Sequence, residues 1–137
     1  MSKTSSITIE FDINVSPKEL VRIFIDKGWN YVRDGDVFYI EQTDIDDYDW
    51  ISKPALVFDI ESFLSTHKYY DRVAIWLEHE FCGGSFHFYP DKLMILLSVD
   101  IPMLEGWNCQ DFSLCLKQLS FLLDYASVPA VECSVVY

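Results

Sequence analysis

The chain has 137 residues, of which 50% are hydrophobic and 16% aromatic, and its formal net charge is −12 at pH 7. This length and composition predict one domain, residues 1–137, with a core of its own, and exclude an intrinsically disordered chain. The negative charge argues against binding to nucleic acid or to an anionic membrane surface, and it favours either simple solubility or a basic protein partner.

The first two predicted elements are a strand and a helix. Apolar and polar side chains alternate over residues 6–15, which is typical of a half-buried strand. Ser16, Pro17 and Glu19 follow with the pattern of a capping box that has proline in the first helical turn. Gly28 marks the end of this helix.

A hairpin is predicted next. Asp34-Gly35 separates two aromatic and β-branched segments, residues 29–33 and 36–41, which predicts two strands joined by a tight turn. Residues 42–50 are then expected to form an acidic loop.

A second helix is predicted over residues 59–70, with His67 on its inner face as a hydrogen-bonded core residue. Residues 55–58, immediately before it, are compatible with a short strand.

Three consecutive strands are predicted at residues 72–80, 85–89 and 92–99, with turns at residues 83–84 and 90–91. The third strand does not alternate, so we expect it to be central and covered on both faces.

A last helix is expected to begin at the cap residue Asn108 and to end before Val128 and Pro129, and residues 130–137 form a terminal strand. The predicted order is β-α-β-β-α-β-β-β-α-β. This order indicates an α+β domain in which about three helices pack on an antiparallel sheet.

The segment from Asp34 to Trp50 has the most informative composition. It holds seven carboxylates, and no Lys or Arg lies between Arg33 and Lys53. Aromatic side chains beside carboxylates can stack on arginine while the acids pair with it. A solvated charged loop is the alternative. The predicted partner-binding residues are Asp44, Asp46, Asp47, Tyr48, Asp49 and Trp50.

The same segment does not fit a calcium loop. Tyr48 occupies the third ligand position, Asp49 replaces the required glycine, and the closing glutamate would fall at Ala55. We therefore predict no metal site and no cofactor.

Glu78, Glu80 and His87 are secondary site candidates. A hairpin turning at Gly83 and Gly84 would place His87 opposite Glu80, with Glu78 on the same face. Such a pair could act as acid and base, although a surface ion pair is the commoner reading. His79 would point the other way, which argues against a zinc site.

The chain carries no nucleophile elbow and no glycine-rich phosphate loop, so we predict that it is not an enzyme. Its start does not resemble a signal peptide, and no apolar run approaches a bilayer span. The four cysteines lie among apolar residues and form no CxxC motif. We expect reduced thiols in a cytoplasmic protein.

In its size, acidity and lack of catalytic motifs, the chain resembles bacterial immunity proteins, which neutralise toxins by direct binding. The resemblance implies a basic partner such as a nuclease, whose phosphate-binding cleft an acidic, aromatic surface would fill. Electrostatic attraction would then make capture fast.

Two other functions fit the sequence. A secretion chaperone is also small, acidic and α+β, but it usually opens with a helix, and its binding along apolar grooves should survive high salt. A small-ligand-binding protein or enzyme would use an aromatic-lined apolar pocket, with Glu80 and His87 or the acidic loop at its mouth.

Overall fold

A computed structural model describes residues 4–41, 49–80, 82–98 and 111–136. Within these ranges the elements follow in the order β1 (Thr4–Glu10), α1 (Pro17–Asp26), β2 (Asp36–Ile40), β3 (Trp50–Pro54), α2 (Ile60–Ser65), β4 (Val73–His79), β5 (Cys82–Phe88), β6 (Lys92–Leu97), α3 (Ser113–Leu119), the 3-10 helix η2 (Ser120–Asp124) and β7 (Ala130–Val136).

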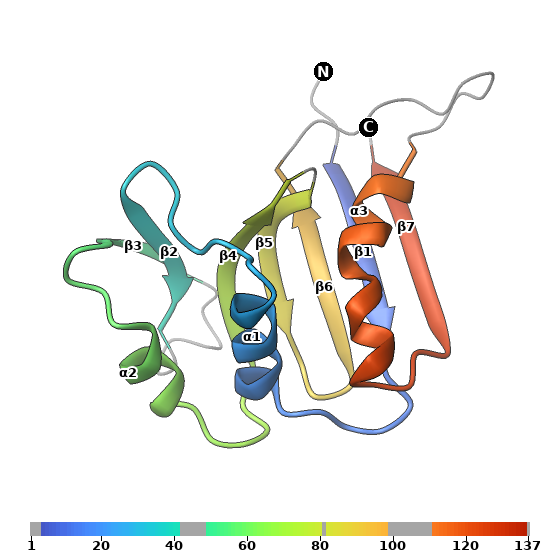
Figure 1. Cartoon of the computed structure of the whole chain (residues 1–137), viewed down its shortest axis with the longest axis horizontal. Helices are drawn as coiled ribbons and strands as arrows, with labels where there is room; N and C mark the ends of the chain where they lie inside the picture. Colours follow the sequence, from blue (N-terminus) through green and yellow to red (C-terminus); the bar gives the residue numbers. More distant parts are fainter. Residues whose placement is uncertain (1–3, 42–48, 81, 99–110, 137) are drawn as a thin grey trace.

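The strands form one antiparallel sheet in the order β3-β2-β4-β5-β6-β1-β7, and the three α-helices lie on one face of it (Figure 1). The predicted α+β class is therefore confirmed, and the predicted order of helices and strands roughly matches the observed one. None of the helices in the described ranges has the length and apolarity needed to cross a bilayer.

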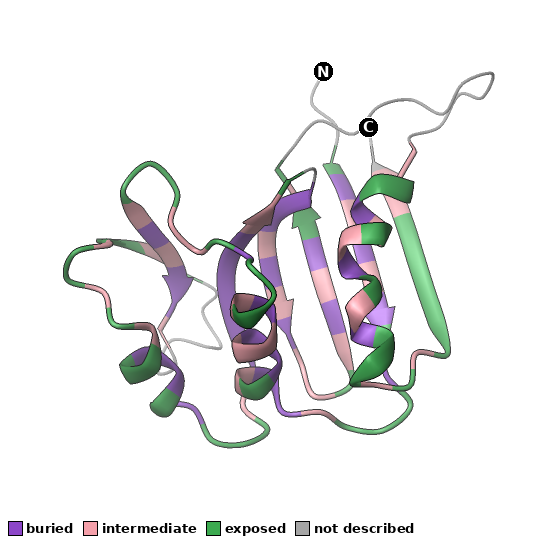
Figure 2. Ribbon diagram, in the orientation of Figure 1, coloured by how far each residue is buried: buried purple, intermediate pink, exposed green. Residues whose placement is uncertain are grey.

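The core lies between this sheet face and the helices (Figure 2). Cross-strand pairing aligns one buried side chain from each central strand, because paired residues point to the same face. Ile7, Ile75, Phe86 and Ile95 form such a row, and each is 0% exposed.

Phe24 of α1 is the helix residue with the most ring contacts in this core. Its ring packs edge-on against Trp29, Phe86, Phe88 and Phe121, with centroid distances of 4.8–5.6 Å. Phe24 itself is 0% exposed. The helix that follows β1 is thereby joined to the centre of the sheet and to η2.

The start of α1 differs from the predicted capping box. Ser16 is the N-cap residue, but its hydroxyl donates to the carbonyl of Tyr69 and makes no cap hydrogen bond. Glu19 pairs with Arg22, one turn on, so it does not reach back to Ser16. Helix α1 begins with Pro17 and is held by burial of its apolar stripe, and Gly28 ends it with φ at 93°.

The predicted hairpin is only half correct. Asp34 and Gly35 make the tight turn with positive φ angles, and residues 36–40 form β2. Residues 29–33, however, make two isolated bridges, one at Asn30 and one at Arg33, and no strand. Both edges of β2 are already occupied, by β3 and by β4, so no ladder is open to the earlier segment.

Other boundaries move as well. Strand β3 covers residues 50–54 rather than 55–58, and α2 ends at Ser65 rather than near residue 70. Strand β6 is internal in the sheet but is not covered on both faces, because Leu96 is 42% exposed. The predicted last helix consists of α3 and η2; its expected cap, Asn108, lies outside the described residues.

Candidate functional site

The face of the sheet opposite the helices carries side chains of a mixed kind, and we call it the helix-free face. Its register rows follow from the strand pairing, in which His87 aligns with Ala74 and Met94, and Ser85 with Trp76 and Leu96. On the described strands this face includes Thr8, Ile40, Trp50, Ala74, Trp76, Glu78, Ser85, His87, Met94 and Leu96.

Trp50 and Asp49 are the two predicted partner-binding residues that the structure describes. Asp49 is exposed, and Trp50 opens the edge strand β3 with 36% of its surface accessible. The other predicted partner-binding residues, Asp44, Asp46, Asp47 and Tyr48, lie outside the described residues. Their role in binding stays a prediction.

The Trp50 ring lies across the helix-free face. It meets the imidazole of His87 at 90° with centroids 5.5 Å apart, although β2 and β4 separate their strands. Ala74 is the partner of His87 on β4, and its small side chain leaves room for an indole to reach over the sheet. The contact orients the ring, while 36% of the Trp50 surface stays accessible.

Trp76 forms a second aromatic feature of this face. It is only 4% exposed, the guanidinium carbon of Arg33 lies 5.5 Å from its ring centre, and its Nε1 donates to the hydroxyl of Ser98 at 3.4 Å. Sequence reasoning missed this residue together with Met94 and Leu96. Their alternation with core residues along β4 and β6 was the available signal.

One end of the helix-free face is basic. Arg72 and Lys92 lie over the ring of Tyr89 at 5.7 Å and 5.3 Å from its centre. Burial, followed by the charge of Arg72, lowers the pKa of His87 below its ordinary value of 6.5. His87 is therefore neutral at pH 7 and serves here as an aromatic surface for Trp50. The seven carboxylates of residues 34–50 lie outside this group of residues.

The predicted Glu80–His87 pair does not form. The hairpin turns at Glu80, which has a positive φ of 49°, and not at Gly83 and Gly84, which lie within β5. His87 consequently aligns with Ala74, and Glu78 aligns with Gly83. Two of the three secondary candidates, Glu78 and His87, share the helix-free face, while Glu80 lies in the turn.

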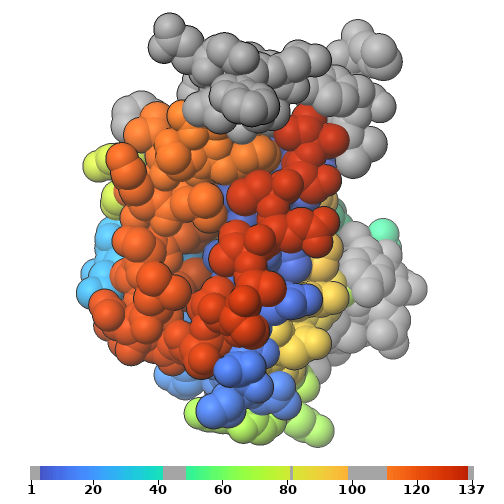
Figure 3. Space-filling model, turned by 90° about the vertical axis from the view of Figure 1, so that its right-hand side faces the viewer, coloured from blue at the N-terminus to red at the C-terminus, as the bar shows by residue number. Residues whose placement is uncertain are grey.

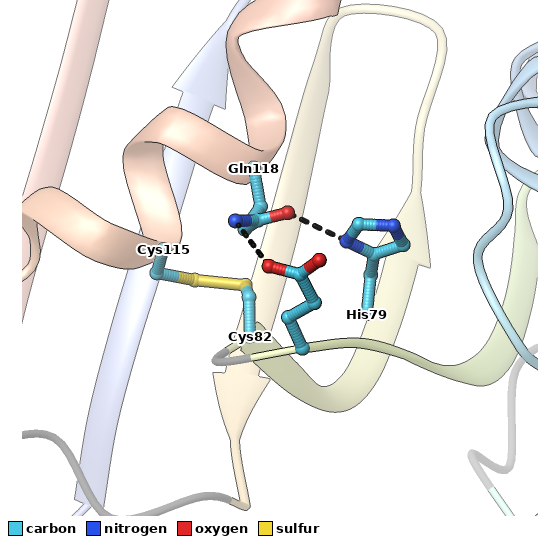
Figure 4. Close-up of a disulfide and its surroundings, with 5 residues drawn as sticks. His79, Cys82, Cys115 and Gln118 are labelled. Atoms are coloured by element: carbon cyan, nitrogen blue, oxygen red, sulfur yellow. Dashed lines mark hydrogen bonds between the residues drawn. A yellow bond between two sulfur atoms is a disulfide. The ribbon is translucent and has the colours of Figure 1, made fainter.

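Glu80 belongs instead to a hydrogen-bonded chain with α3. Gln118 donates from Nε2 to the Glu80 carboxylate at 3.2 Å, and its Oε1 lies 2.6 Å from Nδ1 of His79 (Figure 4). The imidazole of His79 also lies beside the Trp29 ring, with centroids 5.4 Å apart. These contacts hold the hairpin end against the helix.

A disulfide joins Cys82 of β5 to Cys115 of α3, with Cα atoms 4.8 Å apart (Figure 4). The expectation of reduced thiols is thus wrong for these two residues. They lie 33 positions apart in the chain, and this spacing did not predict the pairing. Cys133 is a free thiol on an exposed part of β7.

A cleft of about 360 Å³ opens between β2, β3 and α2. Tyr39, Glu41, Lys53, Asp59 and Ser62 are among its lining residues, and neither Glu80 nor His87 is. Two of its lining side chains are hydrogen-bonded to each other, since Ser62 Oγ donates to the Asp59 carboxylate at 3.0 Å. The Asp59 carboxylate accepts from two backbone N–H groups at the start of α2, and burial and the neighbouring Glu41 raise the pKa of Tyr39.

Within the described ranges, no three His, Cys, Asp or Glu side chains gather closely enough to hold a metal ion. His67 follows the end of α2 and is a hydrogen-bonded core residue, as expected: it is 3% exposed and its Nδ1 lies 2.9 Å from the carbonyl of Phe63.

Comparison with known proteins gives no match, since no family model, curated protein or solved structure is significantly similar to this chain.

Proposed function

We propose that this chain is a protein-binding module that neutralises a basic protein by direct contact, as bacterial immunity proteins do with toxins. The observation that supports the proposal most directly is Trp50. Its ring is partly exposed, is supported from below by His87, and follows Asp49 at the end of the acidic segment.

A partly exposed, supported indole suits the role of an interface anchor. Tryptophan is enriched among the residues that dominate binding energy, because it buries a large area at a small cost in side-chain entropy. His87 restricts the ring before binding, and that lowers the cost further. An arginine of the partner could stack on the free side of the ring while its guanidinium pairs with Asp49.

The net charge of −12 complements such a partner. Long-range attraction raises the association rate for a basic protein, and salt screens it over about 10 Å at 0.1 M. In a nuclease toxin the basic, phosphate-binding cleft would be the target surface. A cytoplasmic location is part of this proposal. The Cys82–Cys115 disulfide does not favour it, because a reducing cytoplasm would oppose that bond.

The proposal is tested with the products of the genes that neighbour this one. Each is expressed alone and together with this chain, and growth and complex formation are measured. We expect one product to be toxic alone, to be neutralised by this chain, and to form a stoichiometric complex. Failure of every neighbour to bind or to be neutralised would count against an immunity function.

The association rate then separates this mechanism from a chaperone. Between about 50 mM and 500 mM salt, we expect the rate to fall at least tenfold, because steering is electrostatic. The double substitution Asp44→Lys and Asp47→Lys should lower it similarly at low salt and leave the fold intact. A complex insensitive to both changes would indicate an apolar groove and a chaperone-like function.

A further inference from the structure

Among the described strands, none pairs with the outer edge of β7. Within the described sheet β7 is the outermost strand, next to β1. Hydrogen bonding in an antiparallel pair alternates from residue to residue. The backbone N–H of Phe11 donates to the carbonyl of Asp91, next to β6, whereas the N–H of Asp12 donates to the carbonyl of Ser127, next to β7. The even-numbered residues of β1 therefore direct their backbone hydrogen bonds to β7.

The partners of those even residues on β7 are Ala130, Glu132 and Ser134. The backbone N–H and C=O groups of Val131, Cys133 and Val135 therefore point away from the sheet. Natural edge strands are usually protected by charged side chains, proline or a bulge. Between residues 130 and 136, β7 has one charged side chain, Glu132, and neither proline nor a bulge. Figure 3 looks onto this edge, where β7 and α3 lie side by side on the surface.

An apolar groove borders the edge on the helix-covered side. It has a volume of about 250 Å³ and lies between the helical segment α3–η2 and the strands β1 and β7. Leu116, Leu119, Leu123, Val128 and Val131 line it, and Leu123 and Val131 are 66% and 48% exposed. Exposed leucine and valine in a groove favour burial against another apolar side chain.

The other side of the same edge is acidic. Thr8, Glu10 and Glu132 line a hollow of about 310 Å³ on the helix-free side. Lys92 is the cross-strand partner of Glu10, but its ammonium lies over the Tyr89 ring. The two sides of β7 thus offer different chemistry to anything that pairs with it.

We propose that β7 binds an extended segment of a partner protein as an eighth strand, with alternating apolar and basic side chains. Successive side chains of a strand point to opposite faces, so the apolar ones would enter the groove and the basic ones would reach Glu10 and Glu132. Charge excludes a second copy of this chain as the favoured occupant, because its own β7 would bring another Glu132 to the acidic side.

This inference goes beyond the proposed function, since β7 and β3 are opposite edges of the sheet. Its test uses synthetic, end-blocked heptapeptides labelled with fluorescein, and anisotropy measures binding to the full chain. One peptide alternates valine and lysine, one alternates valine and glutamate, and one has the lysines and valines in two blocks. We expect the alternating lysine peptide to bind at least tenfold more tightly than either of the others.

Two variants of one position provide the matched control. Cys133→Pro removes an outward N–H and leaves the bonds to β1 intact, whereas Cys133→Ser keeps that N–H. We expect at least a tenfold loss of peptide affinity for the proline variant and no change for the serine variant. If Cys133→Pro fails to fold, Glu132→Lys replaces it and should shift the preference toward the glutamate peptide.

Equal affinity for the alternating and block peptides would overturn the proposal, because net attraction would then explain the binding. Full binding by the folded proline variant would overturn it too. Sedimentation that shows a dimer abolished by Cys133→Pro would assign the edge to a second copy and overturn it likewise.

Discussion

The indole of Trp50 rests edge-on against the imidazole of His87, 5.5 Å between ring centres, across two intervening strands. The contact joins the edge strand β3 to the centre of the sheet on the helix-free face. It also explains how a large ring at the end of an acidic segment is neither buried in the core nor free in solvent, at 36% exposure. Orientation of Trp50 is therefore a property of the fold.

Replacement of Trp50 should weaken partner binding and leave the domain folded. Trp50→Ala removes the anchor, and we expect the dissociation constant to rise more than tenfold, about 1.4 kcal/mol. Tyr70→Ala, at an aromatic position that is 54% exposed, is the control and should have no effect. Titration calorimetry with the neutralised partner measures both. Equal affinities for the two variants would place the interface elsewhere.

Stability should decrease as the pH falls from 7 toward 5. Burial is the main cause that lowers the pKa of both His67 and His87 below 6.5. The folded state thus binds protons less readily than the unfolded chain, so its stability is complete above pH 6.5 and is lost as the pH falls toward the folded-state pKa. Urea unfolding at pH 8, 6 and 5 measures this slope.

The pKa values of the Asp59 and Asp111 carboxyls are lowered from their ordinary value of 3.8. These groups therefore titrate below pH 5, and the contribution of the histidines can be measured separately. His87→Gln should remove part of the slope between pH 7 and 5. A slope unchanged in a double variant with His67→Gln would show that other groups carry it.

Gly84→Ala should be strongly destabilising. A Cβ atom at this position would lie 2.0 Å from the carbonyl oxygen of Leu96 on β6, and backbone cannot yield as a flexible side chain can. We expect a loss of about 3 kcal/mol in the free energy of unfolding. Gly83→Ala is the matched control: its Cβ would meet Glu78 Cγ at 3.1 Å, and that side chain can move. Similar losses for both variants would contradict the explanation.

Loss of the Cys82–Cys115 disulfide should destabilise the domain through the unfolded state. The bond closes a segment of 33 residues, and for such a loop the entropy model gives about 3–4 kcal/mol. Cys115→Ser should unfold at correspondingly lower denaturant. Cys133→Ser, which alters only the exposed free thiol, should match the parent chain. A parent chain whose unfolding midpoint is unaffected by reductant would argue against a stabilising bond.

The α+β class was predictable because alternation and turn residues mark most elements locally. The turn between β4 and β5 was not, and Gly83-Gly84 shows why. A pair of glycines is typical of a turn, but Gly84 is needed where β5 and β6 approach too closely for any Cβ. That requirement depends on the backbone of Leu96, which belongs to a later strand. The actual turn uses Glu80 with a positive φ angle, a conformation that local sequence seldom predicts for a residue other than glycine.

The candidate site was predictable only in part. Its acidic and aromatic composition drew attention to Trp50, but the contact with His87 depends on the order of four strands and on a small residue at position 74. The disulfide was not predicted for a similar reason. Cys82 and Cys115 are brought together by packing of α3 on β5, and they share no local sequence pattern.

Phe24 touches Phe121, so an early helix and a late one meet around a single ring. During synthesis this core cannot be completed until the C-terminal segment has left the ribosome. A nascent or truncated chain that ends after β6 would leave one side of Phe24 uncovered, which makes the last quarter of the sequence a condition for folding of the first.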